Sequence, residues 1–187
     1  MAGSSQDQLM LNNLLDRCKE EWQLALTQRK HPYRFFVLGT AGDSRPELRT
    51  VVLRDYNSEL MEFTIYTDAR SSKVSSLNKN EAVEILFYNP EKLTQVRVQA
   101  QCILKEQDDF LFNEQALASQ KDYTTNLAPG SPIDSVSSVS FLNEEHHFLK
   151  LVFQATQLDY LELKRPVHIR ALFIKEKESW TGEFRTP

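Results

Sequence analysis

Residues 47–95 read ELRTVVLRDYNSELMEFTIYTDARSSKVSSLNKNEAVEILFYNPEKLTQ, and the rest of the chain is interpreted around this stretch. β-Branched and aromatic residues are concentrated in three runs, at 48–54, 60–66 and 82–88, which is typical of strands. A short helix is expected at 71–77, between the second and third runs. The stretch therefore predicts strand, turn, strand, short helix, strand, and then a turn into a fourth strand.

Three cations lie at or just beyond the ends of these strands: Arg49, Arg54 and Lys73. Ser71 and Ser72 precede Lys73, in what is expected to be the first turn of the helix. Free backbone N–H groups at a helix start, hydroxyls and cations are together what a phosphate group requires. Each cation taken alone is better explained as a solvated surface charge, or for Arg54 as an ion pair with Asp55. Their combination predicts a phosphate site.

The remaining pattern predicts one β-rich domain. Helices are expected at 6–29 and 109–120, strands at 33–40, 94–104, 148–154, 158–163 and 167–175, a loop at 55–58 and a tail at 180–187. About eight strands, mostly at hairpin spacing, favour an antiparallel barrel with added helices over a doubly wound sheet. A single domain over residues 1–187 is expected, with an N-terminal helix in 1–30 and a long loop at 121–140.

Composition excludes several functional classes. The chain has 187 residues and a formal net charge of −4, which argues against nucleic acid or an anionic membrane as a partner. It has 5 glycines and no GxGxxG or GxxxxGK[ST] motif, so a Rossmann fold or a P-loop is not expected. Cys18 and Cys102 match no zinc spacing, and the histidines show no metal spacing. No metal, free thiols and a cytoplasmic protein are expected.

Three motifs occur in a fixed order: R-x-V-V-L-R at 49–54, Y-T-D-x-x-S-S-K at 66–73 and T-Q-V-R-V at 94–98. As a set they resemble the pyridoxamine 5′-phosphate oxidase superfamily of FMN-binding split barrels. The resemblance extends from Tyr33 to Pro187, and the ending WTGEFRTP is similar to the family's W-x-x-x-R-L-x-P, with Arg185 one place late. It implies a mainly β (α+β) split antiparallel barrel that binds FMN and forms a homodimer with FMN at the subunit interface.

The resemblance also implies roles for individual residues. The cofactor-binding residues would be Arg49, Val51, Val52, Leu53, Arg54, Tyr66, Thr67, Ser72, Lys73, Gln95, Tyr160 and Arg170. Within this set, Arg49 and Lys73 would hold the FMN phosphate with help from Ser72. Residues 51–53 would run past the flavin ring. Gln95 would donate its amide to the ring.

Two of these residues, Tyr160 and Arg170, would reach FMN from the partner subunit. Other readings of both stay open. Tyr160 is explained equally well as an ordinary strand residue, and Arg170 by a salt bridge to Glu162 or Asp159.

Departures from the family pattern concern the substrate. Pro166 stands where the family has an arginine, although His168 is kept, and residues 110–119 contain no arginine or tyrosine for a substrate phosphate. Oxidation of pyridoxine phosphate is therefore disfavoured, since each lost charge-assisted hydrogen bond would cost about 1.5–3 kcal/mol. Arg54 and His168 remain candidates for a substrate pocket, and no catalytic residue is identified.

Two functions follow from these expectations. The first is an FMN-dependent oxidoreductase acting on an unidentified small substrate. The second is a non-catalytic FMN carrier or sensor whose pocket is closed by residues 121–140. Replacement of FMN by heme or a deazaflavin also stays open.

Overall fold

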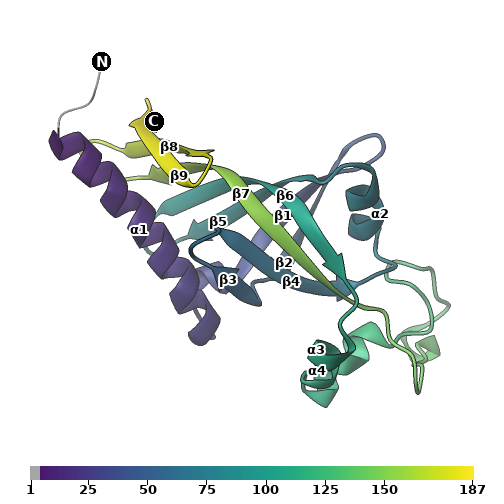
Figure 1. Cartoon of the computed structure of the whole chain (residues 1–187). Helices are drawn as coiled ribbons and strands as arrows, with labels where there is room; N and C mark the ends of the chain where they lie inside the picture. The colour runs from purple at the N-terminus through teal and green to yellow at the C-terminus, as the bar shows by residue number, and fades with distance from the viewer. Residues whose placement is uncertain (1–4) are drawn as a thin grey trace.

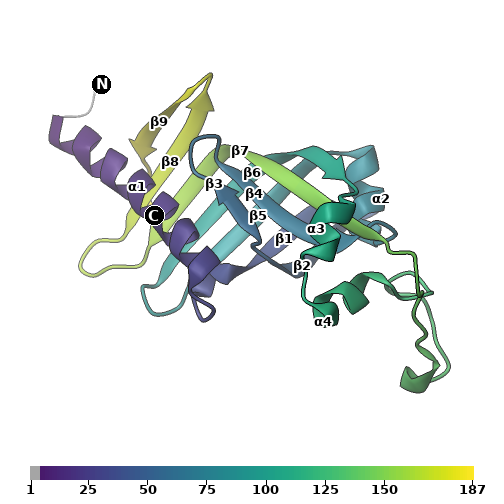
Figure 2. The same ribbon diagram turned by 60° about the horizontal axis from the view of Figure 1, so that its bottom comes forward.

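In the computed structural model, which describes residues 5–187, nine strands form one antiparallel sheet. The strand order is β2-β1-β5-β6-β7-β4-β3, and β8 and β9 continue the sheet from β7. The sheet curls into a half-barrel, with a long helix along one side (Figure 1 and Figure 2). The expected mainly β split barrel is confirmed.

The strands are β1 (Phe35–Ala41), β2 (Pro46–Val52), β3 (Asp55–Asn57), β4 (Glu62–Asp68), β5 (Ala82–Asn89), β6 (Thr94–Glu106), β7 (Phe148–Glu162), β8 (Ile169–Glu176) and β9 (Ser179–Phe184). The helices are α1 (Ser5–Thr27), α2 (Ser72–Lys79), α3 (Asp109–Asn113) and α4 (Leu117–Gln120), with short 3₁₀ turns at Pro32–Arg34, Lys121–Tyr123 and Val136–Ser138. Among the described residues, no helix is long and apolar enough to cross a bilayer.

Helix α1 packs on the sheet through five buried side chains, of which Trp22 is the largest. Trp22 is 0% exposed, and its ring packs edge-on against Phe63 at 4.9 Å and close to Phe87 at 5.5 Å. Burying an aromatic side chain of this size contributes about 1.5–3 kcal/mol or more. The helix expected within residues 1–30 is therefore observed from Ser5 onward. Residues 1–4 lie outside the described part of the chain.

Alternation along β6 separates a core face from an outer face. Val96, Val98 and Cys102 are at most 1% exposed, whereas Arg97 and Gln99 point to the other side and are exposed. This is the alternation expected for a half-buried strand. Both cysteines are buried free thiols, as expected.

Strand β7 is one long strand, and the prediction of two strands at 148–154 and 158–163 is wrong. Its first half pairs with β4 and its second half with β8, while β6 pairs along both halves. Thr156 is an extra residue between the Gln99–Gln157 and Ala100–Ala155 pairs, and its hydroxyl donates to the Gln99 carbonyl at 3.1 Å. This β-bulge redirects the strand without ending it. The interruption of the hydrophobic pattern at residues 155–157 therefore marks the point where the partner of β7 changes from β4 to β8.

Three further predictions need correction. Residues 55–57 form strand β3, because β4 supplies its hydrogen-bond partners, and residues 179–184 form β9 against β8. The helix expected at 109–120 is two short helices separated by residues 114–116. Residues 121–140 are mostly irregular, as expected, but they contain two 3₁₀ turns, and Thr125 forms an isolated bridge with Phe141.

Candidate functional site

The predicted phosphate site lies where β2, the end of β4 and the start of α2 meet. Arg49 is in the middle of β2, opposite Leu38 of β1. Ser71 is the N-cap residue of α2, so Ser72 and Lys73 occupy its first turn. The Val74 N–H already donates to the Ser71 carbonyl at 3.0 Å, whereas within residues 5–187 the N–H groups of Ser72 and Lys73 have no acceptor and are available to an anion.

Lys73 is a half-buried cation without a carboxylate partner. Its Nζ donates to Thr67 Oγ1 at 2.8 Å, and that hydroxyl lies 3.3 Å from Ser71 Oγ. Among residues 5–187, no carboxylate lies within ion-pairing distance of the Lys73 ammonium group. Burial lowers the pKa of Lys73, and the neighbouring guanidinium of Arg49 lowers it further. Two cations held close together in this way favour an anion of more than one charge.

Arg49 is held in place by hydrogen bonds from both terminal nitrogens of its guanidinium group. Nη1 donates to Thr40 Oγ1 at 2.7 Å and to the Glu47 carbonyl at 3.1 Å. Nη2 donates to Glu47 Oε2 at 2.7 Å, and the Ser72 hydroxyl donates to the same oxygen at 3.2 Å. The described chain thus brings Arg49, Thr67, Ser72 and Lys73 into one cluster, as the sequence predicted.

Strand β2 is an edge strand, bonded on one side to β1. An edge strand carries a row of backbone N–H and C=O groups directed away from the sheet. Val51 and Val52 are half-buried and keep part of their surface accessible, whereas Leu53 is fully buried and its N–H already donates to the Arg34 carbonyl at 2.8 Å. A flat ring along this edge would meet residues 51–52 more readily than Leu53.

Arg54 lies beside two tyrosines. Its guanidinium carbon is 5.5 Å from the centre of the Tyr66 ring, and its charge also acts on the Tyr123 phenol. Burial raises the pKa of both tyrosines, and the charge of Arg54 partly opposes that rise. Both phenols are therefore neutral hydrogen-bond donors near neutral pH. Tyr123 was not predicted, because it lies four residues beyond 110–119, where the resemblance places a tyrosine for the substrate phosphate.

Gln95 and Arg170 lie together, but at another place on the sheet. Both are cross-strand neighbours of Leu161, so their side chains share the outer face. Arg170 forms a two-pronged ion pair with Asp159 at 3.0 and 2.7 Å, and Arg97 bonds to the same carboxylate. Of the two salt bridges that would explain Arg170, the one to Asp159 is therefore present.

Tyr160 and His168 do not join the phosphate cluster within one chain. Tyr160 is 2% exposed on the core face, and its hydroxyl donates to Glu162 at 2.7 Å, so its position does not support the predicted flavin contact. His168 is exposed just before β8, whose first residue pairs with Glu162, whereas Tyr66 pairs with Lys150 at the other end of β7. Twelve residues of fully extended strand span at most about 40 Å, so His168 lies near one end of β7 and Arg54 towards the other.

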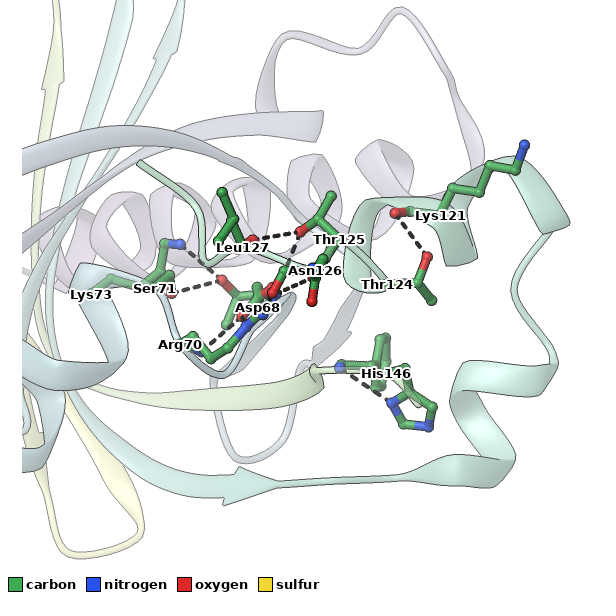
Figure 3. A network of polar contacts seen from close by, with 12 residues as sticks. Asp68, Arg70, Ser71, Lys73, Lys121, Thr124, Thr125, Asn126, Leu127 and His146 are labelled. Carbon is green, nitrogen blue, oxygen red and sulfur yellow. Dashed lines mark hydrogen bonds and ion pairs between the residues drawn. The ribbon is translucent and has the colours of Figure 1, made fainter. Parts of the chain in front are cut away.

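A clamp beside the cluster holds the 121–143 segment. Arg70 forms two bonds with the Asp68 carboxylate at 3.1 and 2.7 Å, and donates to the backbone carbonyls of Thr125 at 2.8 Å and Asn126 at 2.9 Å (Figure 3). Asp68 is 4% exposed. The clamp was not predicted from the sequence. An aspartate at the end of a strand followed two residues later by an arginine, as in Asp68 and Arg70, is a pattern that could have indicated the ion pair.

Comparison with known proteins places the chain in a family. The family model described as pyridoxamine 5′-phosphate oxidase, FMN-binding domain, matches residues 13–106, which include the phosphate cluster and Gln95. Curated relatives named pyridoxine/pyridoxamine 5′-phosphate oxidase, from the Paris and Philadelphia 1 strains of Legionella pneumophila, are 28% identical over 138 residues, or 71% of this chain. The chain spans 62% of the length of these relatives.

Solved structures share the fold. A pyridoxamine 5′-phosphate oxidase-related, FMN-binding protein from Nostoc punctiforme superimposes with a TM-score of 0.72 at 23% identity, covering 88% of this chain and 94% of that one. PhzG from Burkholderia lata, solved with tetrahydrophenazine-1-carboxylic acid, gives a TM-score of 0.74 at 13% identity, covering 98% and 95%. At these identities the two structures establish the architecture.

The donor set of the cluster fits the phosphate of FMN. Within residues 5–187 it combines a guanidinium, an ammonium without an acidic partner, hydroxyls and the N–H groups of Ser72 and Lys73. The adjoining edge strand leaves backbone groups for a ring that follows the phosphate.

Proposed function

Because the chain belongs to the pyridoxamine 5′-phosphate oxidase family of FMN-binding domains, we propose that it is an FMN-dependent oxidoreductase acting on a small substrate. As a member of that family it is an FMN-binding flavoprotein. The oxidoreductase activity is the proposal. A carrier or sensor is the outcome to be distinguished from it.

The observation that carries the proposal is the cation pair of Arg49 and Lys73. Both are held by hydroxyls, on Thr40 and Thr67, and Lys73 has no acidic partner among residues 5–187. A doubly charged phosphate would relieve the repulsion between the two cations and gain charge-assisted hydrogen bonds from both. Ser72 would add a hydroxyl donor. The predicted phosphate contacts thus converge on one place in a single chain.

The ring would lie along the β2 edge, with backbone groups of residues 51–52 facing it. The redox chemistry is that of bound FMN, which transfers hydride equivalents. The protein would hold the ring in register, keep water away through the apolar Val51 and Val52 side chains, and place the substrate. Arg54 lies two residues beyond the end of this strand and would serve to place the substrate.

Arg54, Tyr66 and Tyr123 would form the substrate side of the site. They offer one cation and two neutral phenols with a raised pKa. That donor set suits a flat substrate with one negative charge or a polar edge, because a phosphate dianion calls for more than one cation. This argument supports the earlier expectation that pyridoxine phosphate is a poor substrate.

We include a homodimer in the proposal. Gln95 and Arg170 share an outward face that is separate from the phosphate cluster of the same chain. Their predicted contact with the flavin therefore requires a second chain. The exposed Tyr88 ring lies opposite Gln95 on β5 and would be covered in such an interface. Sedimentation of the purified protein is expected to give twice the mass of one chain.

Reduction of the bound cofactor tests the proposed activity. Protein reconstituted with FMN is titrated anaerobically with NADPH, NADH and chemical reductant, and its absorbance is followed before and after air is admitted. Bleaching of the flavin band by a nicotinamide, and its recovery in air, are expected of an oxidoreductase. A band that responds to chemical reductant alone, also in the presence of a panel of candidate substrates, would favour the carrier or sensor.

A further inference from the structure

Glu47 occupies the predicted phosphate cluster with its own carboxylate. Oε2 accepts from Arg49 Nη2 at 2.7 Å and from Ser72 Oγ at 3.2 Å. These two donors come from β2 and from the first turn of α2, which are more than twenty residues apart in sequence. One carboxylate oxygen thus bridges the two elements that the phosphate is expected to bridge.

The guanidinium of Arg49 does not depend on this carboxylate for its position. Nη1 is held independently by Thr40 Oγ1 at 2.7 Å and by the backbone carbonyl of Glu47 at 3.1 Å. If the Glu47 side chain turned away, Nη2 would remain directed at the cluster. The Ser72 hydroxyl, on an exposed residue, would likewise be released for another acceptor.

The Glu47 carboxylate can also leave the cluster. The side chain is 39% exposed, against 19% for Arg49, so it can turn into water without leaving a buried charge unpaired. If the Glu47 carboxylate stayed in the cluster beside a phosphate dianion, two anions would share the same donors. Their electrostatic repulsion is strongly unfavourable at such short range. Glu47 and a phosphate are therefore alternative occupants.

We propose that Glu47 is a built-in competitor of the cofactor phosphate: its carboxylate takes the place of one phosphate oxygen between Arg49 and Ser72, and it turns outward when a phosphate ester binds. The inference rests on the proposed phosphate role of this cluster. Lys73 is not engaged by Glu47 and remains the cation that attracts the incoming dianion. Glu47 would set the affinity for the phosphate and thereby the preference for FMN over riboflavin.

The test compares Glu47→Gln and Glu47→Ala with the wild-type protein. The matched control is Glu84→Gln, an exposed glutamate on β5 outside the cluster. Apo protein is titrated with FMN and with riboflavin by flavin fluorescence, and stabilisation by inorganic phosphate is measured as a shift in Tm. Both Glu47 variants are expected to bind FMN at least about tenfold more tightly and to gain more from phosphate, because the donors no longer have to exchange one anion for another. Riboflavin affinity is expected to stay unchanged, as is every property of the control.

Two results separate failure of this inference from failure of the proposed site. If Arg49→Ala and Lys73→Ala weaken FMN binding but both Glu47 variants bind it no better than wild type, the cluster holds the phosphate and Glu47 is not a competitor. If neither cation substitution affects FMN binding, the phosphate lies elsewhere and both ideas are wrong. A larger gain with riboflavin than with FMN would also overturn the inference.

Discussion

Lys73 donates from its ammonium group to the Thr67 hydroxyl at 2.8 Å, although the half-buried cation has no carboxylate partner within residues 5–187. The carboxylate of Asp68 lies one residue further along, but it is engaged by Arg70. The chain thus neutralises Arg70 and leaves Lys73 for an external anion. Lys73 can therefore bind and release a dianion without exchanging an internal carboxylate partner.

Substitution of Lys73 tests the phosphate site directly. Lys73→Met keeps the aliphatic stem and removes the charge, and it is expected to weaken FMN binding about 10- to 100-fold, the equivalent of one charge-assisted hydrogen bond of about 1.5–3 kcal/mol. The measurement is the dissociation constant from flavin fluorescence. The control is Lys79→Met. Lys79 lies on the same helix as Lys73 but is exposed and pairs with Asp43, so this variant should bind FMN like wild type. Equal affinity of both variants would contradict the assignment of Lys73.

Asp159 predicts a dependence of stability on pH. Burial alone would raise the pKa of Asp159, but hydrogen bonds from Arg170 and Arg97 outweigh it and hold the pKa below the ordinary value of 3.8. A lowered folded-state pKa means that the unfolded chain binds the proton first, so the stabilisation is present above pH 3.8 and is lost as the pH falls through the folded-state pKa. Asp159→Asn should be less stable than wild type at pH 7, and this difference should shrink below about pH 4 in urea unfolding. A constant difference across that range would rule out the ionised carboxylate as the cause.

Arg70→Ala is expected to release the 121–143 segment. The substitution removes the bonds to the Thr125 and Asn126 carbonyls and leaves Asp68, which is 4% exposed, without its cation. An unpaired buried carboxylate costs at least about 1–3 kcal/mol. Amide hydrogen exchange should accelerate at Asn126 and Leu142, whose N–H groups bond within the segment, but remain slow in β6. Arg185→Ala, an exposed arginine paired with Glu183, serves as the comparison, and slow exchange in both variants would contradict the clamp.

Trp22→Ala is expected to destabilise the fold by about 3–5 kcal/mol, the range for removing a fully buried large aromatic side chain. Trp22 is 0% exposed and contacts the rings of Tyr56, Phe63 and Phe87. Denaturant unfolding followed by circular dichroism gives the loss. Leu9→Ala, on the exposed side of the same helix at 61% exposure, should change stability by less than about 0.5 kcal/mol. Similar losses for the two variants would mean that α1 is not anchored through Trp22.

The sequence by itself determined most of the sheet and the core of the candidate site. Alternation of Val96, Val98 and Cys102 with polar residues predicted which face of β6 is buried, because a strand directs successive side chains to opposite sides. The order of the arginine, the serines and the lysine in residues 49–73 predicted the cluster, because the strand and the helix start that carry them are local structures set by nearby residues. Arg49 lies in the middle of β2 and not at its end, because the strand begins at Pro46. The family model supports FMN as the ligand of the domain that contains them.

Tertiary structure alone decided the contacts between distant segments. That β7 continues through Thr156 follows from a partner, β6, more than fifty residues earlier in the chain. Arg54 meets Tyr123, and Arg70 meets Thr125, because the 121–143 segment folds back onto the end of β4, which local preferences do not encode. Glu47 reaches Ser72 because the folded chain brings β2 next to the start of α2. The sequence gives the charge of each side chain and the face of the strand that carries it. Which charged side chains bind the same anion depends on which strands and helices the fold brings together.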